Sequence, residues 1–145
     1  MNNTNFYSTK LIDLGSCCFR QPFAESHCRF LHGYRLQAKL YFMSNKLDKN
    51  NWVMDFGGLK NLKKDLRETF DHTTVISEKD PKINLFKNLV KEEVIQLVIL
   101  PEISIEMFAK YCLEKANEMI DKRVLCYRVE VYEHERNCGI YELKN

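Results

Sequence analysis

Alternating hydrophobic and polar positions mark both ends of the chain. Residues 34–43 place Leu36, Ala38 and Leu40 on one face, and residues 6–20 mix β-branched and aromatic side chains with polar ones. Successive side chains of a strand point to opposite faces, so this pattern predicts an antiparallel pair of strands. Residues 123–133 and 138–142 repeat the alternation across a short polar connection, which predicts a C-terminal hairpin.

Two segments show the spacing of amphipathic helices. One follows Asp55, whose carboxylate suits a helix N-cap, and is predicted to end near Phe70; the other follows Ser104. Their inward positions are predicted to be Leu59, Leu62, Leu66 and Phe70 in the first, and Ile105, Phe108, Ala109, Cys112, Leu113, Ala116 and Ile120 in the second.

The middle of the chain is less regular. Residues 81–91 are predicted to form a short helix, 95–100 a short strand or extended segment, and 21–30 a loop long enough to fold over a site. The principal order is β-β-α-α-β-β. This order favours an α+β fold in one domain, residues 1–145, with a sheet covered by helices on one face.

Composition narrows the function classes. The 145 residues are 45% hydrophobic and 29% charged, with a formal net charge of +2 and no basic stripe. We therefore expect a globular protein that binds a small ligand rather than nucleic acid. The polar start of the chain and the short apolar run at 94–100 argue against a signal peptide or membrane span, so a cytoplasmic protein is expected.

Cysteine and histidine supply the candidate reactive groups. The six cysteines lack paired C-x-x-C spacing, which favours reduced thiols. Cys28 falls in the predicted loop and is the best candidate nucleophile or base, whereas Cys112 falls on an apolar helix stripe and is interpreted as core. Asp71 beside His72 suits either a carboxylate that fixes an imidazole tautomer or a cap favoured by the helix dipole.

Five motifs in order along the chain are similar to those of the 6-pyruvoyl-tetrahydropterin and 6-carboxy-tetrahydropterin synthase family. The motifs are Cys28-Arg-Phe-Leu-His32-Gly-Tyr34, Trp52-Val-Met-Asp55-Phe56-Gly-Gly-Leu59-Lys60, Phe70-Asp71-His72, Ser104-Ile-Glu106-Met-Phe-Ala109, and Glu133 followed by Gly139-Ile140-Tyr141. The resemblance implies the tunnelling fold, a four-stranded antiparallel sheet with two helices on one face. It also implies a homo-oligomer, usually two stacked trimers, with active sites at subunit contacts.

The resemblance also assigns roles. Cys28, Asp71 and His72 match a catalytic proton-relay triad, Glu133 matches the carboxylate that anchors the pterin ring, and Glu106 matches a glutamate near the substrate. The pattern of hydrophobic and polar positions alone predicts that both glutamates are surface charges. The gap between Cys28 and His32 resembles the 6-carboxy-tetrahydropterin synthase branch of queuosine and deazapurine biosynthesis. That branch converts 7,8-dihydroneopterin triphosphate to 6-carboxy-tetrahydropterin and releases acetaldehyde and triphosphate.

The chain departs from the family at the metal positions. The family binds zinc through three histidines, but here Phe19 and Tyr34 occupy two of those positions and only His32 remains. Phenylalanine cannot ligate and a neutral tyrosine is a poor zinc ligand. Cys17 or His27 is a possible substitute by spacing alone, and Tyr34 is a possible hydrogen-bond donor to a developing oxyanion.

Three functions remain open from the sequence. The first is a pterin-processing lyase that uses Cys28, Asp71 and His72. The second is a zinc-less relative that binds a pterin or purine-like ring through Glu133 with altered or no catalysis. The third, a purely structural protein, is disfavoured because it has no evident need for these residues together.

Overall fold

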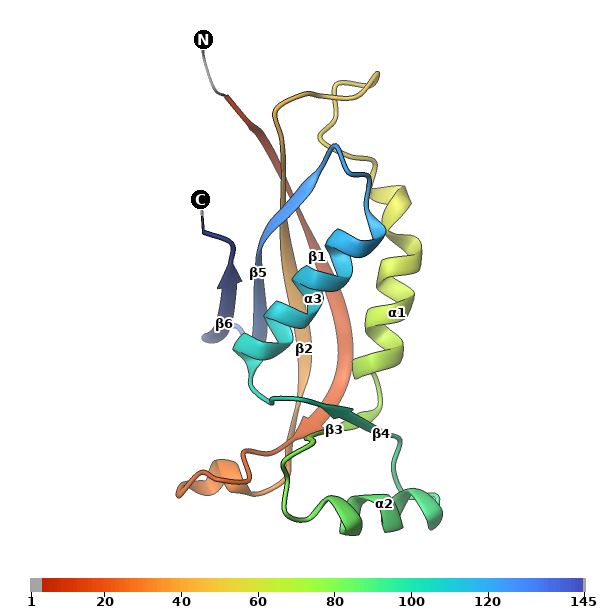
Figure 1. The fold of residues 1–145 in the computed structure, drawn as a ribbon, viewed down its shortest axis with the longest axis vertical. Helices are drawn as coiled ribbons and strands as arrows, with labels where there is room; N and C mark the ends of the chain where they lie inside the picture. The colour runs from red at the N-terminus through yellow and green to blue at the C-terminus, as the bar shows by residue number, and fades with distance from the viewer. Residues whose placement is uncertain (1–3, 145) are drawn as a thin grey trace.

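A computed structural model describes residues 4–144 and shows one six-stranded sheet with three α-helices (Figure 1). The strands follow the spatial order β4-β3-β1-β2-β5-β6. In chain order the elements are β1 (Phe6–Phe19), a 3-10 helix (His27–Arg29), β2 (His32–Ser44), a 3-10 helix (Phe56–Leu59), α1 (Lys60–Phe70), β3 (Thr73–Ser77), α2 (Ile83–Lys91), β4 (Leu97–Leu100), α3 (Ile105–Met119), β5 (Leu125–His134) and β6 (Asn137–Glu142).

The four long strands form the predicted antiparallel pairs. β1 pairs with β2, β2 with β5, and β5 with β6, so the N-terminal pair and the C-terminal hairpin are confirmed. Phe19, the last residue of β1, lies opposite His32, the first residue of β2. The end of this strand pair therefore carries the connection that contains Cys28.

The helices α1 and α3 cover one face of the sheet, as predicted (Figure 1). Leu62, Leu66 and Phe70 of α1 are buried against the sheet, and α3 adds Phe108, Ala109, Cys112, Leu113 and Ala116. Ser104 caps α3 by accepting a hydrogen bond from the Met107 amide at 3.0 Å. Asp55 caps the 3-10 turn before α1 rather than α1 itself, because its carboxylate accepts from the Gly57 amide at 2.8 Å.

Residues 73–100 add elements that the principal order lacks. The short helix and strand predicted there are present as α2 and β4, but β3 was not predicted. All five residues of β3 are buried, so no alternation marks it as a strand. β3 pairs in parallel with the end of β1 and with β4, which makes the sheet mixed rather than purely antiparallel.

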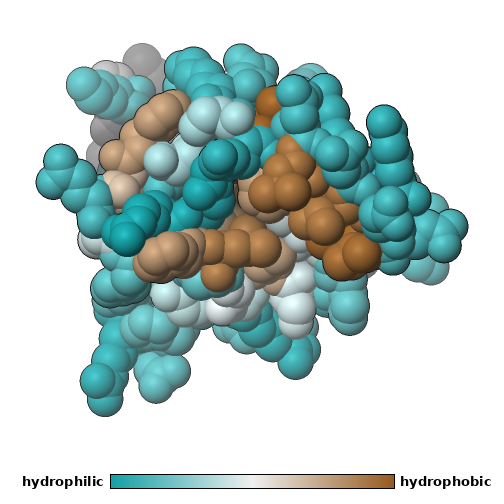
Figure 2. All heavy atoms as spheres, turned by 90° about the horizontal axis from the view of Figure 1, so that it is seen from below, coloured by the Kyte–Doolittle hydropathy of each residue, from teal (hydrophilic) through white to brown (hydrophobic). Residues whose placement is uncertain are grey.

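The end of the molecule that carries α2 and residues 20–31 exposes apolar side chains. Viewed from this end, apolar residues lie between hydrophilic ones (Figure 2). The exposed large apolar residues of these segments are Phe23, Phe30, Leu31, Leu85 and Val90, and Val94 adds another just after α2. None of the helices within residues 4–144 combines the length and hydropathy that a membrane span requires.

Candidate functional site

Four residues singled out from the sequence line one cavity. Cys28, His32, Glu106 and Glu133 surround a space of about 530 Å³, called here the thiol cavity. They come from the 3-10 helix, from the start of β2, from the first turn of α3 and from the end of β5. The fold thus brings a thiol, an imidazole and two carboxylates to one end of the sheet.

Backbone contacts fix the segment that carries Cys28. Ser26 caps the 3-10 helix, and its hydroxyl accepts from the Cys28 amide at 3.3 Å. The Cys28 carbonyl accepts from the Gln21 amide at 2.9 Å. The side chain of Cys28 is half-buried, which leaves the thiol accessible from the cavity.

Gly139 allows β6 to approach the first turn of α3. A Cβ atom at this glycine would lie 2.6 Å from the Glu106 amide nitrogen, closer than any side chain tolerates. Glycine is therefore required where the hairpin and the helix meet. This close approach holds Glu106 and Glu133 on the same cavity.

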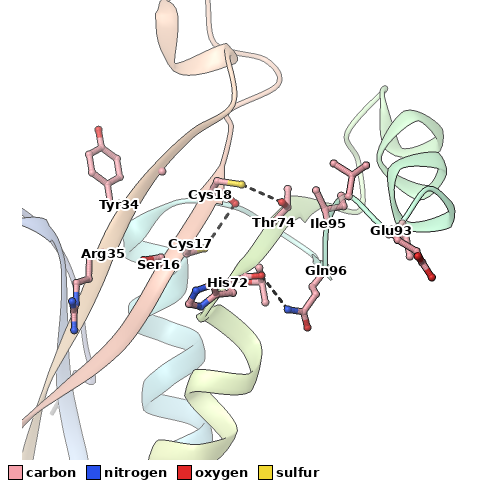
Figure 3. Close-up of a pocket in the computed structure, with 14 residues that line it drawn as sticks. Ser16, Cys17, Cys18, Tyr34, Arg35, His72, Thr74, Glu93, Ile95 and Gln96 are labelled. Atoms are coloured by element: carbon pink, nitrogen blue, oxygen red, sulfur yellow. Dashed lines mark hydrogen bonds between the residues drawn. The ribbon is translucent and has the colours of Figure 1, made fainter.

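Asp71 and His72 lie elsewhere. His72 lines a second space of about 1060 Å³, called here the histidine cavity, together with Cys18, Thr74 and Gln96 (Figure 3). Gln96 donates to the His72 carbonyl at 3.4 Å, and the thiol of Cys18 lies 3.1 Å from the Thr74 hydroxyl. Within one chain the structure does not bring His72 and Cys28 into a common cavity.

A bulge in β1 makes room for Asp71. The register of β1 against β2 shifts between Asp13 and Gly15, and Gly15 has a φ of 92°. The Asp71 carboxylate accepts from the Ser16 amide at 3.0 Å, from His72 Nδ1 at 2.9 Å and from Arg67 at 2.8 Å. The hydrogen bonds from Ser16 and His72, together with the positive charge of Arg67, lower the pKa of Asp71.

The ionised Asp71 fixes the tautomer of His72. Because a carboxylate only accepts, Nδ1 of His72 carries the proton and Nε2 is left free. The imidazole is 76% exposed, so Nε2 reaches solvent or a bound ligand. His72 also has a φ of 59°, a left-handed conformation that costs free energy in a non-glycine residue and often marks functional sites.

Neighbouring residues of β1 connect the two cavities. Cys18 lines the histidine cavity and Phe19 lines the thiol cavity. Cys17 also lines the histidine cavity, so the division between the two cavities falls between Cys18 and Phe19 at the end of β1. Each chain therefore carries two candidate half-sites, because Cys28 lines the thiol cavity whereas His72, paired with Asp71, lines the histidine cavity.

Aromatic rings occupy the positions at which the family resemblance places zinc ligands. The Phe19 ring lies 5.0 Å from the His32 ring and 6.1 Å from the Tyr34 ring, and His32 and Tyr34 pack edge to face at 5.6 Å. Nδ1 of His32 lies 2.7 Å from the Phe30 carbonyl. Burial, with the nearby Glu133 and Cys28, raises the pKa of Tyr34, so its hydroxyl remains a donor.

These residues do not fit a three-ligand zinc site. Across residues 4–144 no group of three histidine, cysteine or acidic side chains is placed to hold a metal ion. Cys17, one suggested substitute, lines the histidine cavity instead, and burial raises the pKa of its thiol to about 12. His27, the other, is exposed and does not line the thiol cavity.

Several residues of the cavities escaped the sequence analysis. Thr74 and Gln96 belong to or adjoin the short strands β3 and β4, and Cys138 and Arg136 adjoin the β5–β6 turn. The buried pattern of β3 gave no signal of a site. Arg136 and Cys138 lie within five residues of Glu133 along the chain, and this closeness in sequence was the one indication that they adjoin the site.

Comparisons with known proteins agree with this architecture. A model of the family described as 6-pyruvoyl tetrahydropterin synthase matches residues 14–144. The 6-carboxy-5,6,7,8-tetrahydropterin synthase of Rickettsia conorii is 38% identical over 60 residues, 41% of this chain and 44% of that protein. Its counterpart from Rickettsia felis is 37% identical over 60 residues. The matched segment spans less than half the length of these relatives.

Solved structures share the fold. An uncharacterised protein from Wolinella succinogenes superposes with a TM-score of 0.85 at 19% identity, over 97% of this chain and 99% of that chain. The 6-pyruvoyl tetrahydropterin synthase of Plasmodium falciparum gives 0.69 at 15% identity, over 99% of this chain and 100% of that chain. The mixed sheet with its helices is thus the tunnelling fold expected from the resemblance.

Proposed function

Because the chain belongs to the 6-pyruvoyl tetrahydropterin synthase family, we propose that it is a pterin-processing lyase of the 6-carboxy-tetrahydropterin synthase type. Its substrate is 7,8-dihydroneopterin triphosphate, and its products are 6-carboxy-tetrahydropterin, acetaldehyde and triphosphate. The observation that carries this proposal is the pair of half-sites. Cys28, Glu106 and Glu133 line one cavity, and the Asp71–His72 pair presents a free imidazole nitrogen to another.

Glu133 holds the pterin ring. A carboxylate accepts two parallel N–H bonds from the 2-amino-4-oxo edge of a pterin, and such charge-assisted pairs are about twice as strong as neutral ones. Glu133 is half-buried at the end of β5, where water competes less for its oxygens. The cavity of about 530 Å³ lies within the usual range for small-molecule sites.

Cys28 and His72 move protons on the pterin side chain from opposite sides. They line separate cavities within one chain, so a complete site forms where the thiol cavity of one subunit meets the histidine cavity of its neighbour. The exposed apolar residues near both cavities, such as Phe30, Leu31 and Val94, supply a surface for that contact. The proposal therefore includes a cytoplasmic homo-oligomer, a trimer or two stacked trimers.

Oxyanion stabilisation falls to the residues present, since they do not fit zinc. The Tyr34 ring packs edge to face on the ring of His32, a residue of the thiol cavity, at 5.6 Å, and the raised pKa of Tyr34 keeps its hydroxyl a hydrogen-bond donor. One well-placed donor contributes about 3 kcal/mol to such a step. Tyr34 thus supports a reaction slower than that of an enzyme with a metal Lewis acid.

The test is direct. Purified protein is incubated with 7,8-dihydroneopterin triphosphate, and acetaldehyde and triphosphate are followed, with Cys28→Ala and His72→Ala as matched variants. We expect product from the wild-type protein and a loss of about 100-fold or more in each variant. Absence of product with and without added zinc rejects the lyase.

A second function is favoured by the aromatic rings at the metal positions. If catalysis was lost with the ligands, the chain still binds a pterin or purine-like ring through Glu133. Calorimetry would then show ring binding that Glu133→Ala removes and Cys28→Ala leaves intact, with Glu135→Ala as the control on the neighbouring turn. A turnover that depends on Cys28 excludes this second function.

A further inference from the structure

Arg20 directly follows β1 and makes three hydrogen bonds with its guanidinium group. Nε and Nη2 donate to the two carboxylate oxygens of Asp80, each at 2.8 Å, and Nη1 donates to the Arg29 carbonyl at 2.9 Å. The side chain of Asp80 is fully buried and that of Arg20 is 17% exposed. Such a planar two-pronged pair fixes direction as well as distance.

Gln21, the next residue, holds the Cys28 segment through a second set of hydrogen bonds. The Gln21 amide donates to the Cys28 carbonyl at 2.9 Å, and the Gln21 side chain donates to the Ile103 carbonyl at 2.5 Å. Ile103 directly precedes Ser104, the cap of α3, which carries Glu106. Arg20 and Gln21 therefore connect residues 28–29 to the start of α3, which lies across the thiol cavity.

Asp80 is itself anchored at the base of α2. Its carboxylate also accepts from the Lys82 amide at 2.8 Å, and its carbonyl accepts from the Ile83 amide at 3.1 Å. The Arg20 guanidinium lies over the ring of Phe86, a buried residue of α2, at 6.0 Å. The Arg20 bonds hold the pKa of Asp80 below its usual range. Through Asp80, the contact of Arg20 with Arg29 is thus tied to the start of α2.

We propose that Arg20, held by Asp80, is a positioning residue for Cys28. It touches neither the thiol nor the thiol cavity; it fixes the backbone at Arg29 while Gln21 fixes the backbone at Cys28. A reactive group that is misplaced by about 1 Å loses much of its rate, so this arrangement sets the efficiency of Cys28 rather than ring binding. The catalytic part of this inference rests on the proposed function, whereas the positioning part does not.

The experiment compares Arg20→Lys, Asp80→Asn and Asp80→Glu with Lys79→Gln. Lysine keeps the charge but cannot bond both Asp80 and Arg29, and glutamate keeps the carboxylate. Lys79→Gln is the matched control, because Lys79 adjoins Asp80 but forms only the exposed pair with Glu102. Hydrogen exchange of residues 21–31 and iodoacetamide alkylation of Cys28, located by mass spectrometry, are measured on the folded protein.

We expect Arg20→Lys and Asp80→Asn to speed exchange in residues 21–31 and alkylation of Cys28 by about tenfold, with β5 and α3 unchanged. Asp80→Glu restores most of the protection, and Lys79→Gln matches the wild type. If the protein turns over a pterin, kcat falls in the first two variants while KM stays constant.

Two results overturn the proposal. Unchanged exchange and alkylation in Arg20→Lys show that the bonds do not hold the segment. An equal rise in hydrogen exchange across the whole sheet shows that the Arg20–Asp80 pair stabilises the fold in general and does not position Cys28 specifically. If Asp80→Asn does not fold, Arg20→Lys decides alone. Exchange and alkylation need no pterin, so absence of turnover in the wild type rejects the lyase and leaves the positioning inference to be judged on its own readouts.

Discussion

The Asp71 carboxylate fills the space that a side chain on Gly15 would occupy. Gly15 has a φ of 92° at the bulge of β1, and a Cβ atom there would overlap Oδ1 of Asp71. The strand and the Asp71–His72 pair are therefore interlocked, although 55 residues separate Ser16 from Asp71 along the chain.

Gly15→Ala is expected to displace Asp71 and release the His72 ring. The left-handed φ and the overlap together cost about 2 kcal/mol of unfolding free energy, and a misoriented base lowers kcat by about 100-fold. Urea unfolding and steady-state turnover measure the two effects. Gly58→Ala is the control, because nothing lies within 4 Å of a Cβ at that position. Equal activity in Gly15→Ala and wild type contradicts the assignment of His72.

Mixed oligomers test whether the two half-sites meet between subunits. Cys28→Ala and His72→Ala proteins are each expected to be inactive, because each lacks one half of every site. After unfolding and refolding as an equal mixture, roughly a quarter of the sites combine an intact thiol half with an intact histidine half. Turnover of the mixture therefore returns to roughly a quarter of the wild-type value. A mixture as inactive as its parents shows that the site is not shared.

Histidines introduced at positions 19 and 34 test the interpretation that Phe19 and Tyr34 prevent zinc binding. Phe19 lies opposite His32 on the paired strand, and Tyr34 follows two residues later on the same face. Phe19→His with Tyr34→His therefore places three imidazoles together, and we expect this double variant to bind one zinc ion and to gain thermal stability with it. The wild type and the single Phe19→His variant are expected to bind none. Metal analysis after dialysis gives the answer, and stoichiometric zinc in the wild type would refute the interpretation.

The pair of Arg20 and Asp80 predicts a specific dependence of stability on pH. The pKa of Asp80 is lowered by folding, so its contribution is complete above its ordinary value of about 4 and is lost as the pH falls through the lower folded value. At pH 7 Asp80→Asn is expected to cost about 2 kcal/mol of unfolding free energy, less than the ~3–5 kcal/mol for a fully buried pair because Arg20 keeps some contact with water.

Urea unfolding of wild type and Asp80→Asn across the acid range measures this difference. It should shrink below pH of about 4 as the wild-type carboxylate takes up its proton. A difference that stays constant down to the acid transition would show that the carboxylate charge is not the source of the stability.

The sequence predicted the parts of the fold that periodicity controls. Alternation located the long strands, and helical spacing located α1, α3 and the short α2. It failed at β3, because residues buried on both faces carry no alternating signal. Its neighbour β4 was found only as a short apolar segment.

The site was predicted in composition but not in arrangement. Cys28, His32, Glu106 and Glu133 share a cavity because strand ends and the start of α3 converge there, and only the family resemblance had indicated a common site for them. The separate position of His72 depends on the parallel pairing of β3 with β1, a contact that no local pattern reveals. The role of Arg20 was equally hidden, since its partner Asp80 lies 60 residues away.

The division of reactive groups between two cavities has a consequence for damaged subunits. Under the proposed assembly, each subunit serves the site on either side of it with a different group. A subunit that folds normally but is damaged at both Cys28 and His72 therefore inactivates two sites rather than one. Such copies interfere with their intact neighbours in proportion to how often they are incorporated, so defective protein in the same cell is more harmful than missing protein.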